Sequence, residues 1–365
     1  MLALQEIRRK KLQFGLITLI VGLVVYLLVM IGALGTGLMS AMSGAIDSFN
    51  ADLVVFSADS NNSFLRSELT SDQQSAVSGV VGTERTGSVG YMVATAQRAA
   101  GSEEVALFGF QPGSIAEPRV TSGRSIEGQS EILFDASLSH SSGLRLGDTI
   151  VMRSALKDYE LTIVGEVDSG QFLGQPAAWV SIDQWREMRY PGQTNDAPAA
   201  SVLLIRGGGS DVSGRVEEAV GNTSVATKGA AVNSIGGVKQ QQQVVMTIEL
   251  FGFVIGALVI GSFFFVLTMQ RSYEIAIFKA MGASNWWVFG QLIRQVTVIA
   301  LAGIALGIPL AVVTAAAIPS DVPLEVTAGA FLTGAISITI AALVGAVFSA
   351  RQVVRVNPIS ALGQM

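Results

Sequence analysis

The residue with the clearest chemical potential in this sequence is Glu249, an acid well inside the apolar stretch 244–270. A carboxylate in the hydrocarbon of a bilayer is costly unless it is protonated or paired, so such a residue marks a candidate functional site. Arg294 stands directly before a later apolar stretch, residues 295–319. The alternative interpretation is that Glu249 reaches water at the outer membrane interface and has no further role.

The neighbours of Glu249 have a spacing that favours close helix packing. Gly252 and Gly256 form a Gly-x-x-x-Gly motif, which lets helices in a membrane approach closely. At about 100° per residue, both glycines fall within about 60° of Glu249, as do Phe253 and Met246. We therefore expect Glu249 to face a helix–helix contact rather than lipid.

A second pair of candidate residues, Tyr26 and Met30, lies at i,i+4 spacing on another apolar stretch. Met30 lies about 28 Å along an ideal helix beyond Lys11, and Glu249 lies about 33 Å before Arg271. Both positions are thus expected in the outer leaflet. Methionine in such a stretch is usually an apolar filler, so Met30 alone is weak support for a site.

The sequence lacks the residue sets of common catalytic and metal sites. It contains no cysteine and a single histidine, His140, whose polar loop is typical of a surface position. The run Gly207–Gly209 lacks the Lys-Ser/Thr that completes a phosphate-binding loop. We expect no enzyme activity, no intrinsic cofactor and no metal site of the chain's own, so an ATPase, if one is needed, is another chain.

The elements that must position these residues follow from the distribution of charge. Half of the residues are hydrophobic, 14% are charged, and the mean hydropathy is +0.51, which is typical of a membrane protein. Four uncharged stretches each exceed the roughly 20 residues that span a bilayer. The predicted segments are 1–11 (cytoplasmic), 12–46 (first span and stalk), 47–239 (outer domain), 244–270 (second span), 271–294 (cytoplasmic loop), 295–319 (third span), 326–350 (fourth span) and 351–365 (cytoplasmic tail).

Basic residues near the ends of the spans predict the orientation. They occur in segments 1–11, 271–294 and 351–365, whereas the loop between the third and fourth spans carries Asp321 and Glu325. By the positive-inside rule both termini are cytoplasmic and 47–239 is extracytoplasmic, in a bacterial cell membrane. The first stretch is too long for a cleaved signal peptide, the competing interpretation. The net charge of −5 gives no reason to expect a nucleic-acid partner.

Residues 47–239 alternate short β-branched runs with glycine-containing turns, which predicts an α+β fold. The length of this segment also allows an arrangement in two lobes. The predicted strands are Leu53–Phe56, Thr149–Arg153, Leu161–Val164, Ala178–Ile182 and Val202–Ile205. The predicted helices are Ser71–Ser78, Ile182–Arg189 and Val212–Val220.

The loop between the second and third spans contains a short amphipathic pattern. Ile275, Phe278 and Gly282 fall on one helical face, and Glu274 and Lys279 lie elsewhere. Such a helix either rests on the membrane surface or docks on a cytoplasmic partner.

At these residues the chain resembles the FtsX/MacB-like family of ABC-transporter permeases. Glu274-Ile275, Lys279-Ala280 and Gly282-Ala283 match the family's loop pattern, and both chain ends and Leu146–Thr149 are also similar. The resemblance implies that two copies pair and that each binds one ATPase subunit, which holds ATP and Mg²⁺. It also implies that the loop helix, through Glu274, Ile275, Phe278, Lys279 and Gly282, makes that contact.

Within the family, the chain is most similar to haem-exporter permeases of the HrtB type, and also to DevC-type exporters. This implies haem as the substrate. Because the spans contain no histidine or cysteine, Glu249, Met30, Tyr26 and Met246 are the available donors to haem iron, with Glu249 and Met30 foremost. Two alternatives stay open: export of lipid-like or drug-like amphiphiles, and an FtsX-like signal relay that controls an extracytoplasmic hydrolase without transport.

Overall fold

The computed structural model describes residues 11–98, 101–136, 138, 143–154, 157–193, 197–270, 277, 281–282, 284–319 and 322–354. The chain divides into two compact units: residues 1–38 with 242–365, called here the helical unit, and residues 39–241, called the α+β domain. Helices α2 (Lys11–Asp47) and α8 (Val238–Gln270) each contain one boundary between these units.

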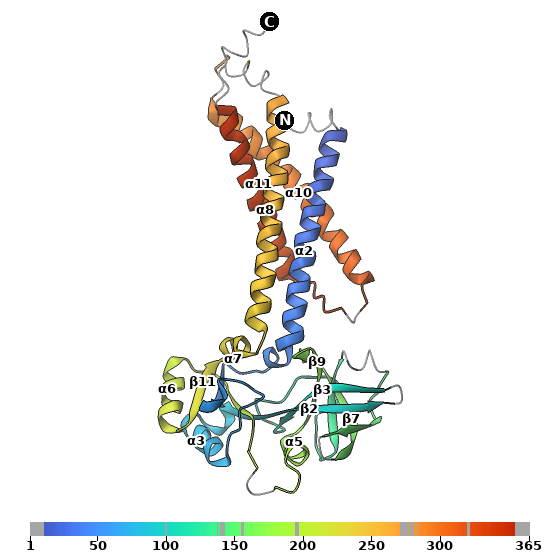
Figure 1. The fold of residues 1–365 in the computed structure, drawn as a ribbon, viewed down its shortest axis with the longest axis vertical. Helices are drawn as coiled ribbons and strands as arrows, with labels where there is room; N and C mark the ends of the chain where they lie inside the picture. Colours follow the sequence, from blue (N-terminus) through green and yellow to red (C-terminus); the bar gives the residue numbers. More distant parts are fainter. Residues whose placement is uncertain are drawn as a thin grey trace. The chain divides into compact units, whose positions relative to one another are not determined.

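The helical unit is built from α2, α8, α10 (Asn285–Ala317) and α11 (Ala328–Val354) (Figure 1). Each of these helices contains a stretch long and apolar enough to cross a membrane, at Phe14–Asp47, Val238–Leu267, Phe289–Ala317 and Ala328–Gly345. The prediction of four transmembrane helices, with the α+β domain between the first and the second, is confirmed.

Glycines permit the close packing of the helical unit. A Cβ placed on Gly303 of α10 would lie 2.5 Å from Cγ1 of Val21, and one on Gly334 of α11 would lie 2.7 Å from Cγ2 of Val29. On α11, a Cβ on Gly345 would lie 2.9 Å from Cα of Gly261 in α8. These contacts place α2 against α10 and α11, and α8 against α11, at distances that a larger residue would prevent.

The α+β domain contains one sheet of 11 strands. The strands are β1 (Leu53–Ser57), β2 (Thr86–Arg98), β3 (Gly101–Phe110), β4 (Val120–Gly123), β5 (Glu131–Asp135), β6 (Thr149–Arg153), β7 (Asp158–Val167), β8 (Gln171–Phe172), β9 (Gln175–Ser181), β10 (Val202–Ile205) and β11 (Thr223–Thr227). Their order is β11-β1-β10-β2-β3-β9-β5-β7-β4; β6 pairs with β2 and β7, and β8 pairs with β9. The β3–β9 and β5–β7 pairs are parallel and the remaining pairs of the sheet are antiparallel.

Alternation along the strands divides the hydrophobic core between the two faces of this sheet. In β3, Ala106 and Phe108 belong to one core, and Val105 and Leu107 belong to another. The first core also contains Ala45, Ile46 and Phe49 from the end of α2 and the following loop. The opposite face is covered by α3 (Ser71–Val81), α5 (Ile182–Arg189) and α6 (Ser210–Ala219), and α7 (Lys228–Ser234) precedes α8 (Figure 1).

The α+β class is confirmed, and several predicted elements agree closely with the observed ones. Strands β6 and β10 and helix α5 have the predicted bounds, whereas β7 and α3 extend beyond them. The β2–β3 hairpin, with β4, β5, β8, β11 and α7, was not predicted. A single sheet connects all parts of the domain, so the two lobes considered above share one continuous framework.

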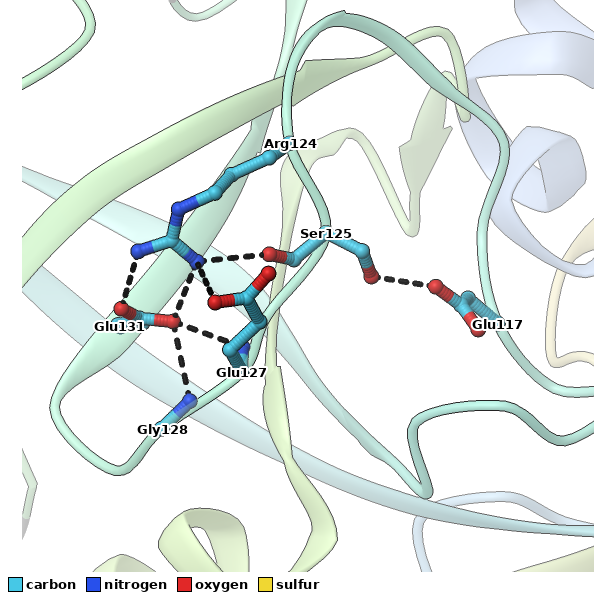
Figure 2. Close-up of polar contacts among 6 residues, drawn as sticks. All are labelled: Glu117, Arg124, Ser125, Glu127, Gly128 and Glu131. Atoms are coloured by element: carbon cyan, nitrogen blue, oxygen red, sulfur yellow. Dashed lines mark hydrogen bonds and ion pairs between the residues drawn. The ribbon is translucent and has the colours of Figure 1, made fainter.

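A charged network fixes the segment that leads into β5 (Figure 2). The guanidinium of Arg124 donates hydrogen bonds to both oxygens of Glu131, and the N–H groups of Glu127 and Gly128 donate to Oε2 of Glu131. The hydroxyl of Ser125 donates to a carboxylate oxygen of Glu117. The hydrogen bonds from Arg124, more than those from the backbone, lower the pKa of Glu131 to about 2.

Candidate functional site

The contact between α2 and α8 forms the framework of the candidate site. The two helices run antiparallel, and three glycines mark where they approach. A Cβ on Gly35 would lie 2.6 Å from Cγ1 of Val245, one on Gly252 would lie 2.9 Å from Cδ2 of Leu28, and one on Gly256 would lie 2.9 Å from Cγ1 of Val24. The Gly-x-x-x-Gly motif therefore packs on α2, as expected.

Glu249 lies at the edge of this contact. Its Oε1 atom is 3.7 Å from the position that a Cβ on Gly32 would occupy, and Cβ of Ala330 in α11 is 3.9 Å from the same position. The carboxylate of Glu249 thus lies beside Gly32, close to α2 and α11, at a distance of ordinary van der Waals contact. No hydrogen bond or ion pair joins this carboxylate to another residue of the described part of the chain.

The expectation that Glu249 faces the helix contact rather than lipid is met only in part. Gly252 and Gly256 are buried, but the side chain of Glu249 is exposed in the single chain. Met246, one turn away, is 72% exposed, and Phe253 is half-buried. One side of α8 therefore carries an acid and a thioether that the rest of the chain leaves uncovered.

Tyr26 and Met30 lie on a different side of α2. The residues of α2 that contact α8 include Val24 and Leu28. Tyr26 is two residues from each of them, and Met30 is two residues from Leu28, so each lies about 160° around the helix from its neighbour. Both side chains are half-buried and pack against the core of the helical unit. The structure thus brings Glu249 and Met246 together and does not bring Tyr26 and Met30 to them; their roles as ligands stay predictions.

Sequence reasoning missed Gly32, the residue of α2 that lies beside the carboxylate of Glu249. The signal was present as a small-x-x-x-small pair, Gly32 and Thr36, in the outer half of the first span. Thr36 donates its hydroxyl hydrogen to the carbonyl of Gly32, which satisfies that hydroxyl within the helix.

Most of the predicted partner-binding loop lies outside the described residues, including Glu274, Ile275, Phe278 and Lys279, as does His140. Gly282 is described and has φ +96°, a conformation that favours glycine. The N–H of Met281, the residue before Gly282, donates to the carbonyl of Ile277 at 3.0 Å. Within the described residues, no group of three or more His, Cys, Asp or Glu side chains is suited to hold a metal ion.

Comparison with known proteins agrees with this architecture. Residues 14–236 match the family model of the MacB-like periplasmic core domain, and residues 246–358 match that of the FtsX-like permease C-terminal domain. An uncharacterised ABC transporter permease from Mycobacterium tuberculosis is 25% identical over 99% of this chain and 98% of its own length. A protein from Staphylococcus haemolyticus named as a putative hemin transport system permease protein, HrtB, is 22% identical over 100% of this chain and 99% of its own length.

Two solved structures are similar to part of the chain. The extracellular domain of the noncanonic ABC-type transporter YknZ from Gram-positive bacteria is 13% identical, with a TM-score of 0.35 over 48% of this chain and 100% of its own. The periplasmic region of MacB from Actinobacillus actinomycetemcomitans is 12% identical, with a TM-score of 0.38 over 52% of this chain and 95% of its own. The match to the MacB-like core domain covers more than half of the chain and the FtsX-like match covers most of the remainder. The chain is therefore an ABC transporter permease of the MacB/FtsX family.

Proposed function

We propose that this permease removes haem from the outer leaflet of a bacterial cell membrane, driven by a separate ABC-type ATPase. In this proposal two copies of the chain pair, each binds one ATPase subunit through the loop helix 273–282, and both termini are cytoplasmic. The similarity over full length to a permease named for hemin transport supports haem as the substrate, and the family supports the ATPase partner.

The observation that carries the proposal is the exposed carboxylate of Glu249. An unpaired carboxylate in the bilayer is tolerated where a ligand, water or a partner compensates its cost. Because the side chain of Glu249 is exposed, a flat ligand can approach its carboxylate from outside the α2–α8 contact. Ferric haem offers a positively charged iron to a carboxylate and an apolar ring to the surrounding side chains.

The second donor is best sought on α8 or in a second copy of the chain. Met246 lies one turn from Glu249 on the same side of α8, and its thioether is exposed. When two copies pair, a second Glu249 or Met246 becomes a further candidate. Met30 and Tyr26 remain proposed donors from α2, where they would meet haem on the side of α2 away from α8.

The test is haem binding by the purified chain, followed by the Soret band. Glu249→Ala should weaken binding by about tenfold or more, which corresponds to a loss of about 1.4 kcal/mol or more, and should shift the band of the remaining complex. Glu249→Gln separates charge from size, because it keeps the side-chain volume. His140→Ala, the matched control for a residue type that usually binds haem, should leave both affinity and band unchanged.

The outcomes also separate the alternatives. If the wild-type protein binds no haem, but a cationic amphiphile stimulates ATP hydrolysis by its complex with the ATPase, export of lipid-like or drug-like molecules would be favoured. Wild-type protein that binds neither, yet whose ATPase complex activates a cell-wall hydrolase, would favour the signal relay. Unaltered haem binding by Glu249→Ala would mean that the acid is merely interfacial and that the site lies elsewhere.

A further inference from the structure

The last turns of α2 are held in the α+β domain by a short segment, residues 169–174, called here the strap. The N–H of Leu173 donates to the carbonyl of Met42 at 3.1 Å, and the N–H of Gly174 donates to the carbonyl of Ala41 at 2.8 Å. These carbonyls lie within α2 and are not among the last four of the helix, whose carbonyls lack partners within it. The strap thus binds the side of the helix rather than capping its end.

The strap and α2 meet backbone to backbone. A Cβ on Gly44 would lie 3.3 Å from the nitrogen of Gln171 and 3.4 Å from Cα of Gly170. Conversely, a Cβ on Gly170 would lie 3.3 Å from Cα of Gly44, and Gly170 has φ +72°. The contact is tight, because a Cβ on either glycine would push its neighbour back slightly, and a side chain as large as leucine would separate the strap from the helix.

A buried carboxylate fixes the strap to strands β5 and β9 of the sheet. Asp135, at the end of β5, is 3% exposed, and its Oδ2 accepts from the N–H of Ser169 at 2.8 Å and of Gly170 at 2.7 Å. The indole N–H of Trp179 in β9 donates to the hydroxyl oxygen of Ser169 at 3.0 Å. A buried carboxylate is retained only where such donors compensate its desolvation, so the network resists deformation.

The strap also has an apolar anchor. Phe172 is 1% exposed, and its ring contacts those of Phe64, Tyr91 and Phe108 at centroid distances of 5.0 to 5.9 Å. At the end of α2 and just beyond it, the carbonyls of Asp47 and Phe49 accept hydrogen bonds from Nζ of Lys228, each at 3.1 Å. The end of α2 is therefore attached to the domain by backbone, polar and aromatic contacts together.

The entry of α8 into the same domain is built differently. Gly236 and Gly237 separate α7 from α8, and Gly237 has φ +91°. A Cβ on Gly236 would have no neighbour within 4 Å, and one on Gly237 would meet only the flexible end of Met42, at 3.3 Å. Side chains next to these glycines, Ile235 and Val238, are nevertheless buried in the first core, so α8 is attached to the domain by apolar contacts rather than by a strap.

We propose that the strap is the joint through which displacement of α2 reaches strands β5 and β9 of the α+β domain. Gly44 and Asp135 are then positioning residues for transport: Gly44 admits the strap, and Asp135 holds the strap to β5. This inference rests on the proposed function as an ATP-driven permease, but it does not depend on haem as the substrate. It requires that α2 and the strap stay together throughout the transport cycle.

A reversible cross-link tests that requirement directly in the full chain with its ATPase. The sequence has no cysteine, so Met42→Cys with Leu173→Cys introduces a single pair, at two positions whose backbones are already joined by the hydrogen bond from the N–H of Leu173 to the carbonyl of Met42. If the strap moves with α2, the oxidised and reduced forms should export at the same rate. A loss of about fivefold or more on oxidation, reversed by a reductant, would show that α2 slides past the strap and would overturn the proposal.

Breaking the joint gives the complementary test. Gly44→Leu and the isosteric Asp135→Asn should both raise hydrogen exchange at the amides of Leu173 and Gly174 and lower export per ATP hydrolysed by about fivefold or more, while ATP hydrolysis continues. Gly15→Leu is the matched control on the same helix, because a Cβ there has no neighbour within 4 Å. Asp135→Asn keeps the test decisive if Gly44→Leu fails to fold.

A readout independent of substrate separates this inference from the proposed function. In the wild-type complex, ATP should change hydrogen exchange in β5 and β9, and Asp135→Asn should abolish that change. If the wild type shows the change but exports no haem, the substrate assignment fails and the joint stands. If Asp135→Asn keeps the wild-type change or exports at the wild-type rate, the joint is not where motion is transmitted.

Discussion

At the scale of single residues, two carboxylates illustrate opposite ways of holding a charge. Glu131 is held by Arg124 and two backbone N–H groups, whereas the carboxylate of Glu249 has no partner within the described residues. The carboxylate of Glu131 has hydrogen-bond donors on both oxygens and therefore stabilises the fold. The carboxylate of Glu249 lacks such donors within the described residues, which points to a ligand, to water or to another copy of the chain.

The hydrogen bonds to Glu131 predict a pH dependence of stability. Its pKa in the folded chain is lowered from 4.5 to about 2, so its stabilising contribution is present above about pH 4.5 and is lost as the pH falls towards 2. Because the Arg124 side chain is 46% exposed, solvent screening limits the contribution to about 1 kcal/mol. Glu131→Gln should lower the free energy of unfolding by about that amount at pH 7, measured by denaturant unfolding of the purified chain.

The control for this prediction is Glu127→Gln. Glu127 is 79% exposed and its carboxylate lies 3.9 Å from Arg124, so its loss should change stability much less. As the pH falls below about 2, wild type and Glu131→Gln should converge, since Glu131 then becomes protonated in the folded state as well as in the unfolded state. A difference that stays constant from pH 7 to pH 2 would show that the charge of Glu131 contributes nothing.

At the scale of secondary-structure elements, local sequence was sufficient where an element carries its own boundary signals. Helix α5 begins after Ser181, whose hydroxyl oxygen accepts from the N–H of Gln184, and its observed bounds are the predicted ones. The β2–β3 hairpin was missed because glycines interrupt its pattern. Gly90 and Gly109 pair across these strands, and a Cβ on either would overlap Trp185 of α5, a tertiary reason that local propensity does not contain.

The same limit applied to the candidate site. The periodicity of α8 grouped Glu249 with Gly252 and Gly256, but in the structure both glycines are buried and Glu249 is exposed. The rotation of α2 relative to α8 depends on both helices, so periodicity within one helix does not reveal that Tyr26 and Met30 lie away from the contact. Gly32 was overlooked for the same reason.

The loop helix carries the prediction at this scale. Replacing Glu274 and Phe278 together by alanine should uncouple ATP hydrolysis from export, since the loop is proposed to dock on the ATPase through these side chains. Membrane insertion and pairing of two copies should be unaffected, and Ser284→Ala, close by in the chain, should behave as wild type. ATPase activity and export measured on the same preparation provide the check. Full coupling in the double variant would refute the assignment.

At the scale of the whole molecule, the chain has four apolar helices and one large domain inserted after the first of them. By the positive-inside rule we predict that the α+β domain lies on the outer side and residues 271–294 on the inner side. Cysteines introduced singly at Ser210 and Ser284 should therefore respond differently to a membrane-impermeant thiol reagent on whole cells. Position 210 should be labelled and position 284 protected, whereas labelling at 284 but not 210 would invert the topology.

The central claim is that this permease exports haem and that Glu249 is part of the substrate site. The most direct measurement is haem tolerance of cells that supply the cognate ATPase but lack this chain, complemented with wild type, Glu249→Ala or His140→Ala at equal membrane abundance. We predict that wild type and His140→Ala restore growth in haem and that Glu249→Ala does not. Growth of the Glu249→Ala cells equal to wild type would contradict the site, and failure of wild type itself to restore growth would contradict haem as the substrate.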